Sequence, residues 1–212
     1  MKKIALAAAM TIFSVNVFAQ YVPAGDTRGT TSVAAGVGSL TERDQAVAVG
    51  ENSHTAFSGV SVGASSQNLN DTGVAIGNGA TTQANFTGAL GAIAIGNNSN
   101  SGGKSLVVGA NAKATDDVAV VIGESSTAGY ESVAVGRGAS VTGTAGAALG
   151  MAASVAQSAT NSVAIGSGTT VTQANTVAVG GRSISQLSDG VAPTDAVTVE
   201  QLNAAIANLT TH

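Results

Sequence analysis

The chain has 212 residues, of which 44% are hydrophobic but only 3% aromatic, with 28 glycines and no cysteine or tryptophan. Its formal net charge is −4, and no basic patch of the kind that binds nucleic acid is present. The lack of cysteine excludes a disulfide scaffold, and the scarcity of aromatic residues argues against an ordinary globular core.

The first 19 residues have the organisation of a secretory signal peptide. Lys2 and Lys3 provide the positive charge, residues 4–15 form an apolar stretch, and Ala19 is a small residue suited to cleavage. A membrane anchor is the alternative, but the apolar stretch is short for a bilayer. We therefore expect an exported chain with no membrane span in its mature part.

A short apolar phrase ending in glycine recurs from residue 33 to residue 180, as in Val133-Ala134-Val135-Gly136. Most successive copies are 13 or 14 residues apart, which predicts a solenoid with one copy per coil. A flexible Gly/Ser/Ala linker is the alternative, but a linker does not keep apolar residues in register. The closing glycines are Gly36, Gly50, Gly63, Gly77, Gly96, Gly109, Gly123, Gly136, Gly150, Gly166 and Gly180.

Within each phrase, the large apolar residues are two positions apart, which is the period of a β-strand. Val133 and Val135 should therefore share one face, and Ala134 should lie on the other. We expect the Val and Ile residues to fill the interior of the solenoid. The small Ala and Gly face would then lie outside, where another backbone can approach it.

The chain divides into five segments. Residues 1–19 are the signal peptide, 20–32 a lead-in or cap, 33–180 the repeat array, 181–198 a neck, and 199–212 the start of a stalk. The long step between Gly77 and Gly96 contains Phe86. We interpret this step as a loop whose phenylalanine either contacts a partner or folds back as a local cap.

After residue 180 the apolar spacing becomes helical. We expect Thr194 to be the N-cap of this helix, with Asp195 in its first turn. A helix of roughly 15 residues is marginal alone, so an a/d seam predicts partner helices and an oligomer. The seam consists of Val199, Leu202, Ile206 and Leu209.

The array, followed by a neck and a coiled coil, resembles the YadA-like trimeric autotransporter adhesins. The resemblance covers residues 33–209, and its most specific part is the neck run 188–202, which reads SDGVAPTDAVTVEQL. It implies an all-β fold, in which a parallel left-handed β-roll of about 14-residue coils forms the head of a homotrimer. A short C-terminal coiled-coil helix would follow it.

Members of this family end in a membrane-embedded anchor, whereas this sequence stops at Leu209-Thr210-Thr211-His212. A released protein, a truncated reading frame and an anchor supplied by another chain are the three explanations left open. We expect an exported protein that is at the cell surface or outer membrane if an anchor is supplied, and secreted otherwise.

One copy of the phrase matches a motif that the family links to collagen binding. The family motif continues with two variable residues and a serine, whereas Thr169 occupies the last position here. The same residues also build the coil, so a purely architectural role is the alternative. The candidate ligand-binding residues are Asn161, Ser162, Val163, Ala164, Ile165 and Gly166.

No catalytic or metal-binding constellation is visible, and we expect no enzyme activity and no cofactor. His54 and His212 are the only histidines, and we place His54 in a polar turn. The acidic pair Asp116 and Asp117 lacks the recurring acidic and glycine pattern of a calcium-binding roll.

The sequence thus favours an exported adhesin head that attaches to collagen, another matrix protein or a cell surface, or that causes autoagglutination. A structural fibre segment without a receptor is the second hypothesis. An ice-binding solenoid is the third, suggested by Thr-Thr pairs at 30–31, 81–82 and 169–170. In the neck, Arg182 is predicted to pair with Asp189 or Asp195 of another chain.

Overall fold

The computed structural model describes residues 31–83 and 91–210. The chain forms two compact units that divide between Gly180 and Gly181. The predicted signal peptide and the loop around Phe86 lie outside the described residues.

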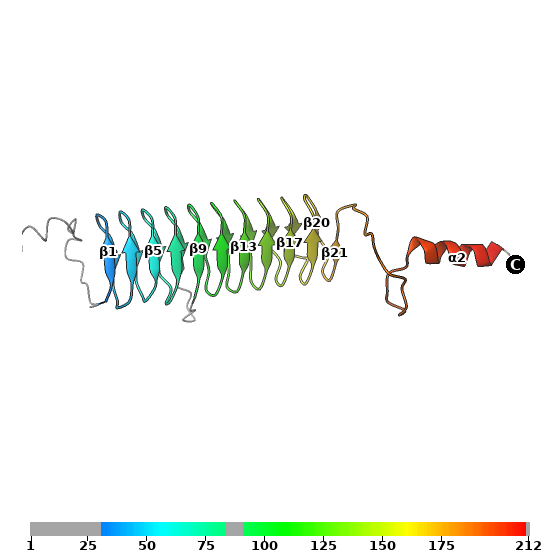
Figure 1. Cartoon of the computed structure of the whole chain (residues 1–212), viewed down its shortest axis with the longest axis horizontal. Coiled ribbons are helices and arrows are strands. Elements are labelled where there is room, and N and C mark those ends of the chain that lie inside the picture. Colours follow the sequence, from blue (N-terminus) through cyan, green and yellow to red (C-terminus); the bar gives the residue numbers. More distant parts are fainter. Residues whose placement is uncertain (1–30, 84–90, 211–212) are drawn as a thin grey trace, which may run out of the picture. The chain divides into compact units, whose positions relative to one another are not determined.

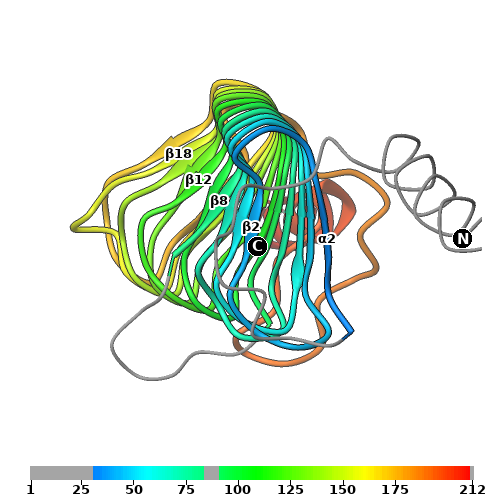
Figure 2. The same ribbon diagram turned by 90° about the vertical axis from the view of Figure 1, so that its left-hand side faces the viewer.

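The first unit is an all-β parallel solenoid, as predicted. Each coil contributes one strand to a first sheet and one to a second, so the described residues form an 11-stranded and a 10-stranded parallel sheet. Figure 1 shows the strands of the first sheet in chain order, and Figure 2 shows successive coils lying over one another. The repeat of about 14 residues is one coil.

The first sheet is built from the recurring phrases, and its strands follow one another at a constant register. In β13 and β15, for example, Val120 pairs with Val133, and Ile122 pairs with Val135. The strands are β1 (Val33–Ala35), β3 (Val47–Val49), β5 (Val60–Val62), β7 (Val74–Ile76), β9 (Ile93–Ile95), β11 (Leu106–Val108), β13 (Val120–Ile122), β15 (Val133–Val135), β17 (Ala147–Leu149), β19 (Val163–Ile165) and β21 (Val177–Ala178).

The second sheet is built from two-residue strands that follow the turn after each phrase. In every one of them the second residue is buried in the solenoid. The strands are β2 (Leu40–Thr41), β4 (His54–Thr55), β6 (Gln67–Asn68), β8 (Thr81–Thr82), β10 (Asn100–Ser101), β12 (Lys113–Ala114), β14 (Thr127–Ala128), β16 (Ser140–Val141), β18 (Ser154–Val155) and β20 (Thr170–Val171).

The closing glycines make the sharp turn between the two sheets and stack in a column. Gly123 has φ +136°, and a Cβ there would lie 2.5 Å from the carbonyl oxygen of Gly136 in the next coil. A side chain at this position is therefore blocked by the neighbouring backbone. Ser126 completes the turn, because its Oγ donates a hydrogen bond to the Gly123 carbonyl oxygen at 2.6 Å.

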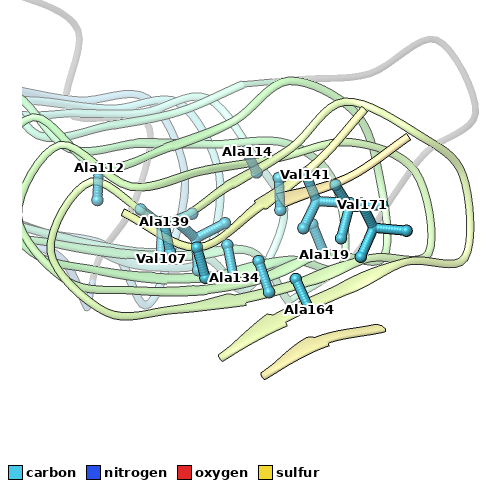
Figure 3. Packing of buried hydrophobic residues seen from close by; sticks show 14 of the residues in the cluster. Val107, Ala112, Ala114, Ala119, Ala134, Ala139, Val141, Ala164 and Val171 are labelled. Atoms are coloured by element: carbon cyan, nitrogen blue, oxygen red, sulfur yellow. The ribbon is translucent and has the colours of Figure 1, made fainter. Parts of the chain in front are cut away.

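The prediction of which residues face inward was wrong. The middle residue of the phrase, such as Ala134, is fully buried, whereas the flanking Val and Ile residues point outward. The reason is space, because the interior of a 14-residue coil is narrow and accommodates small side chains between its two sheets. Figure 3 shows alanines such as Ala134 and Ala164 packed with Val107, Val141 and Val171 inside the coils.

The second unit contains an irregular segment, residues 181–198, and one helix, α2 (Val199–Thr210). The helix has 12 residues, none of them buried. No helix among the described residues is both long and apolar enough to cross a bilayer.

Candidate functional site

The outer face of the first sheet carries two columns of aliphatic side chains. The column at the end of each phrase is the more exposed one, with Ile76, Ile122 and Ile165 at 38%, 39% and 41% exposure. Ten strand spacings of about 4.8 Å make this face about 48 Å long. The residues are Val33, Val47, Val60, Val74, Ile93, Leu106, Val120, Val133, Ala147, Val163 and Val177 in one column, and Ala35, Val49, Val62, Ile76, Ile95, Val108, Ile122, Val135, Leu149, Ile165 and Val179 in the other.

A contiguous apolar face of this length is unusual on a soluble monomer, where large exposed apolar patches mark interaction sites. In contrast, the outer face of the second sheet carries polar residues in its C-terminal part, such as Lys113, Thr127 and Ser140. The aliphatic face of the first sheet, which we call the apolar face, is therefore the main candidate interaction surface of the solenoid.

The start of helix α2 is a capping box, four residues later than the predicted N-cap. Gln201 N donates to Thr198 Oγ1, and Thr198 N donates to Gln201 Oε1, both at 3.2 Å. Thr198 is therefore the N-cap, and the prediction of Thr194 was wrong. A threonine followed three residues later by glutamine is the sequence signal for this arrangement.

The neck segment folds back on the helix start through a small polar network. The side-chain amide of Gln201 makes two hydrogen bonds with the backbone of Gly190. Its Oε1 accepts from Gly190 N and its Nε2 donates to Gly190 O, each at 2.9 Å. Thr198 Oγ1 donates to Asp189 Oδ1 at 2.7 Å. Asp189 thus has a partner within its own chain.

Asp195 closes a tight turn in the same segment rather than lying in the first turn of the helix. Its Oδ2 accepts hydrogen bonds from Ala192 N at 2.8 Å and from Val191 N at 3.0 Å. These two backbone donors, Ala192 first, lower the pKa of the Asp195 carboxyl from its ordinary value. The structure does not test the predicted pairing of Arg182 with either aspartate across chains.

The predicted a/d seam is on the helix and is exposed in the single chain. Val199 is 74% exposed and Leu202 and Ile206 are each about half exposed, with Leu209 at 79%. A 12-residue helix with this apolar stripe in water gains no stability from burying it. This stripe is a second candidate assembly surface, in its own unit.

The six residues of the collagen-type motif are divided between the interior and the surface. Ser162 and Ala164 are buried, and Ser162 Oγ donates to Gln173 O at 2.9 Å and accepts from Thr176 N at 3.0 Å. Val163 and Ile165 belong to the apolar face, and Gly166 closes the strand. Asn161 is exposed at the turn, where its Nδ2 donates to Asn175 Oδ1 at 2.8 Å.

The remaining polar candidates form no reactive cluster. His54 lies in strand β4 rather than in a turn, and its Nε2 is 2.8 Å from Glu42 Oε1. Asp117 Oδ1 accepts from Gly103 N at 2.8 Å, so this carboxylate supports a turn. The described residues contain no group of three or more His, Cys, Asp or Glu side chains that could hold a metal ion.

The threonine pairs do not form an outward row. Thr81 is half-buried, but Thr82 is fully buried and donates to Asn68 Oδ1 inside the coil. In the pair at 169–170, Thr169 is buried and only Thr170 is exposed. Each of these pairs therefore presents one hydroxyl to solvent, which does not favour ice binding.

Comparison with known proteins agrees with this geometry. Two segments, residues 28–53 and 158–183, match the YadA head domain repeat. The solenoid has the fold of a YadA head, and these two segments match that family's head repeat. Among solved structures, the crystal structure of the collagen-binding domain of Yersinia adhesin YadA matches with a TM-score of 0.64 and 24% identity. The match covers 84% of this chain and 98% of that chain.

A search of curated protein sequences found no match. The comparison thus shows a YadA-type head fold. Sequence reasoning missed the apolar face because it assigned the Val and Ile residues to the interior. The available signal was that no middle residue is larger than valine and that most are small, such as Ala48, Ser61 and Ala75.

Proposed function

We propose that the chain forms the head, neck and first part of the stalk of an exported homotrimeric adhesin. The observation that carries this proposal is the apolar face, which extends over all eleven strands of the first sheet. Burying it between copies of the chain removes a large aliphatic surface from water, at a gain of roughly 25 cal/mol per Å².

The exposed stripe of α2 supports the same assembly independently. A parallel coiled coil buries an a/d seam, and Val199, Leu202, Ile206 and Leu209 provide one seam per chain. The number three comes from the family resemblance, since a seam alone is compatible with two, three or four helices. The head is then an exported structure at the cell surface.

For the ligand, we propose an extended matrix protein of the collagen type. The support is the motif at residues 161–166 together with the likeness to a collagen-binding domain. A trimer presents each surface three times, so several weak contacts along an extended ligand would add up by avidity. Of the motif residues, Asn161 is the one whose side chain is exposed outside the apolar face.

Burial of Ser162 and Ala164 favours a second candidate, a structural fibre segment in which the motif serves only the fold. In either case we propose a non-enzymatic role. The two candidates differ in one measurable property, saturable binding to a ligand.

Surface plasmon resonance on collagen and fibronectin separates them. The proposal predicts saturable binding of the assembled protein to collagen and at least about tenfold weaker binding for Asn161→Ala. Asn111→Ala is the matched control, because Asn111 is also exposed and has φ +56° against +54° for Asn161. Absence of saturable binding by a verified trimer would reject the matrix-binding proposal and leave the fibre role.

A further inference from the structure

The interior of the solenoid changes character along the chain. In the N-terminal coils, which span 31–83 and 91–104, every inward residue of the second sheet is polar, whereas in the C-terminal coils, 105–180, every one is apolar. The polar set is Thr41, Thr55, Asn68, Thr82 and Ser101, and the apolar set is Ala114, Ala128, Val141, Val155 and Val171.

The first sheet shows the same change. Its inward residues in the N-terminal coils are alanines and one serine, Ser61, whereas Val107 and Val121 enter the interior in the first two C-terminal coils. All residues of the buried apolar cluster lie between Val107 and Val171. Among the described N-terminal coils, alanines are the only buried apolar residues.

The polar interior is held by hydrogen bonds rather than by apolar packing. Thr55 Oγ1 donates to Val47 O at 2.9 Å, and Asn68 Nδ2 donates to Gly73 O at 3.0 Å. Within the described part of the interior, the buried amide oxygen Asn70 Oδ1 accepts no hydrogen bond. A buried hydrogen bond gains little net stability, and an unpaired buried oxygen lowers it.

In a solenoid, this difference in interior packing affects local stability, because each coil contacts only its neighbours. Its stability is close to a sum over coils and their interfaces, so one stretch can unfold while another remains intact. The apolar face and the glycine column continue through both halves and do not offset the difference.

We infer that the solenoid has two regions of different stability. The C-terminal coils form a stable region, and the N-terminal coils unfold first. Opening proceeds from the N-terminal coils and stops where Val107 enters the core. The inference concerns the interior of each chain and does not rest on the proposed adhesin function. An oligomer of any size, or a monomer, should show the same order.

Hydrogen exchange with mass spectrometry on residues 20–212 tests this inference. Strands β5 and β17 are the matched pair, because each is the third strand from an end of the first sheet. End fraying therefore affects the two strands alike. We expect amides of β5 to exchange at least about tenfold faster than amides of β17. Equal protection, or slower exchange in β5, would overturn the inference.

Substitutions between Val and Thr identify the cause of the difference in stability, since the two side chains have nearly the same shape and differ in the hydroxyl. Val141→Thr with Val155→Thr should raise the exchange rate of β17 toward that of β5. Thr41→Val with Thr55→Val should slow β5, and this variant keeps the test informative if the first one fails to fold. If neither pair moves the exchange rate of its own half, the interior is not the source of the difference.

Discussion

Gly123→Ala tests the glycine column, which sets how closely two coils can approach. Gly123 has φ +136°, where an alanine is strained by about 1–3 kcal/mol. Its Cβ would also lie 2.5 Å from Gly136 O and 2.6 Å from Gly136 C, so the next coil must move away. That movement weakens the bonds from Gly136 N to Ile122 O and from Gly138 N to Glu124 O, both 2.8 Å and each worth about 1 kcal/mol.

We therefore expect Gly123→Ala to lower the free energy of unfolding by about 3–5 kcal/mol. Gly138→Ala is the control, because Gly138 has φ +66° but a Cβ there meets nothing within 4 Å, which leaves a strain of about 1 kcal/mol. The assay is guanidinium unfolding followed by circular dichroism, with all proteins at one concentration because assembly contributes to stability. Equal losses in the two variants would refute the role of close coil contact.

Four further predictions concern assembly and the neck. Ile122→Asp, on the apolar face, should weaken self-association by at least about tenfold in light scattering without changing the strand signal, whereas Thr127→Asp on the second sheet should change neither. Thr198→Ala should destabilise α2 by about 1 kcal/mol in thermal melts while Thr194→Ala has no effect, and the opposite order would restore the predicted cap at Thr194. Because the folded-state pKa of Asp195 is lowered, the contribution of this carboxylate to neck stability is fully present above its ordinary pKa of about 3.9 and is lost as the pH falls through the lowered value. Asp195→Asn should remove this part of the pH dependence in thermal melts at low pH. Arg182→Ala should lower the stability of the assembly by up to about 1 kcal/mol if the cross-chain pair forms, and an unchanged melting temperature would count against it.

The repeat was predictable because a 14-residue period needs only the spacing of glycines and apolar pairs. The direction of the side chains was not, since a period of two places Val133 and Val135 on one face without saying which face is inside. Side-chain volume decides this. The first sheet lines the interior with alanines, one serine and two valines, and the second sheet contributes no inward residue larger than Asn68 or a valine.

Two site residues were misplaced for local reasons. Thr194 followed by Asp195 favours an N-cap at Thr194, but the Asp195 carboxylate instead accepts hydrogen bonds from Val191 N and Ala192 N and closes a turn. His54 reads as a turn residue by its polar neighbours, yet the two-residue strands of the second sheet are too short for any periodic signal. The polar interior likewise could not be foreseen, because inward Thr55 and outward Thr81 look alike in sequence.

The solution mass of residues 20–212, measured by light scattering, tests the central claim most directly. The account predicts a trimer, in which the apolar face and the α2 seam are covered by neighbouring chains. A monomer with strand-rich circular dichroism would contradict it, because about 48 Å of aliphatic sheet would then stand in water without a partner.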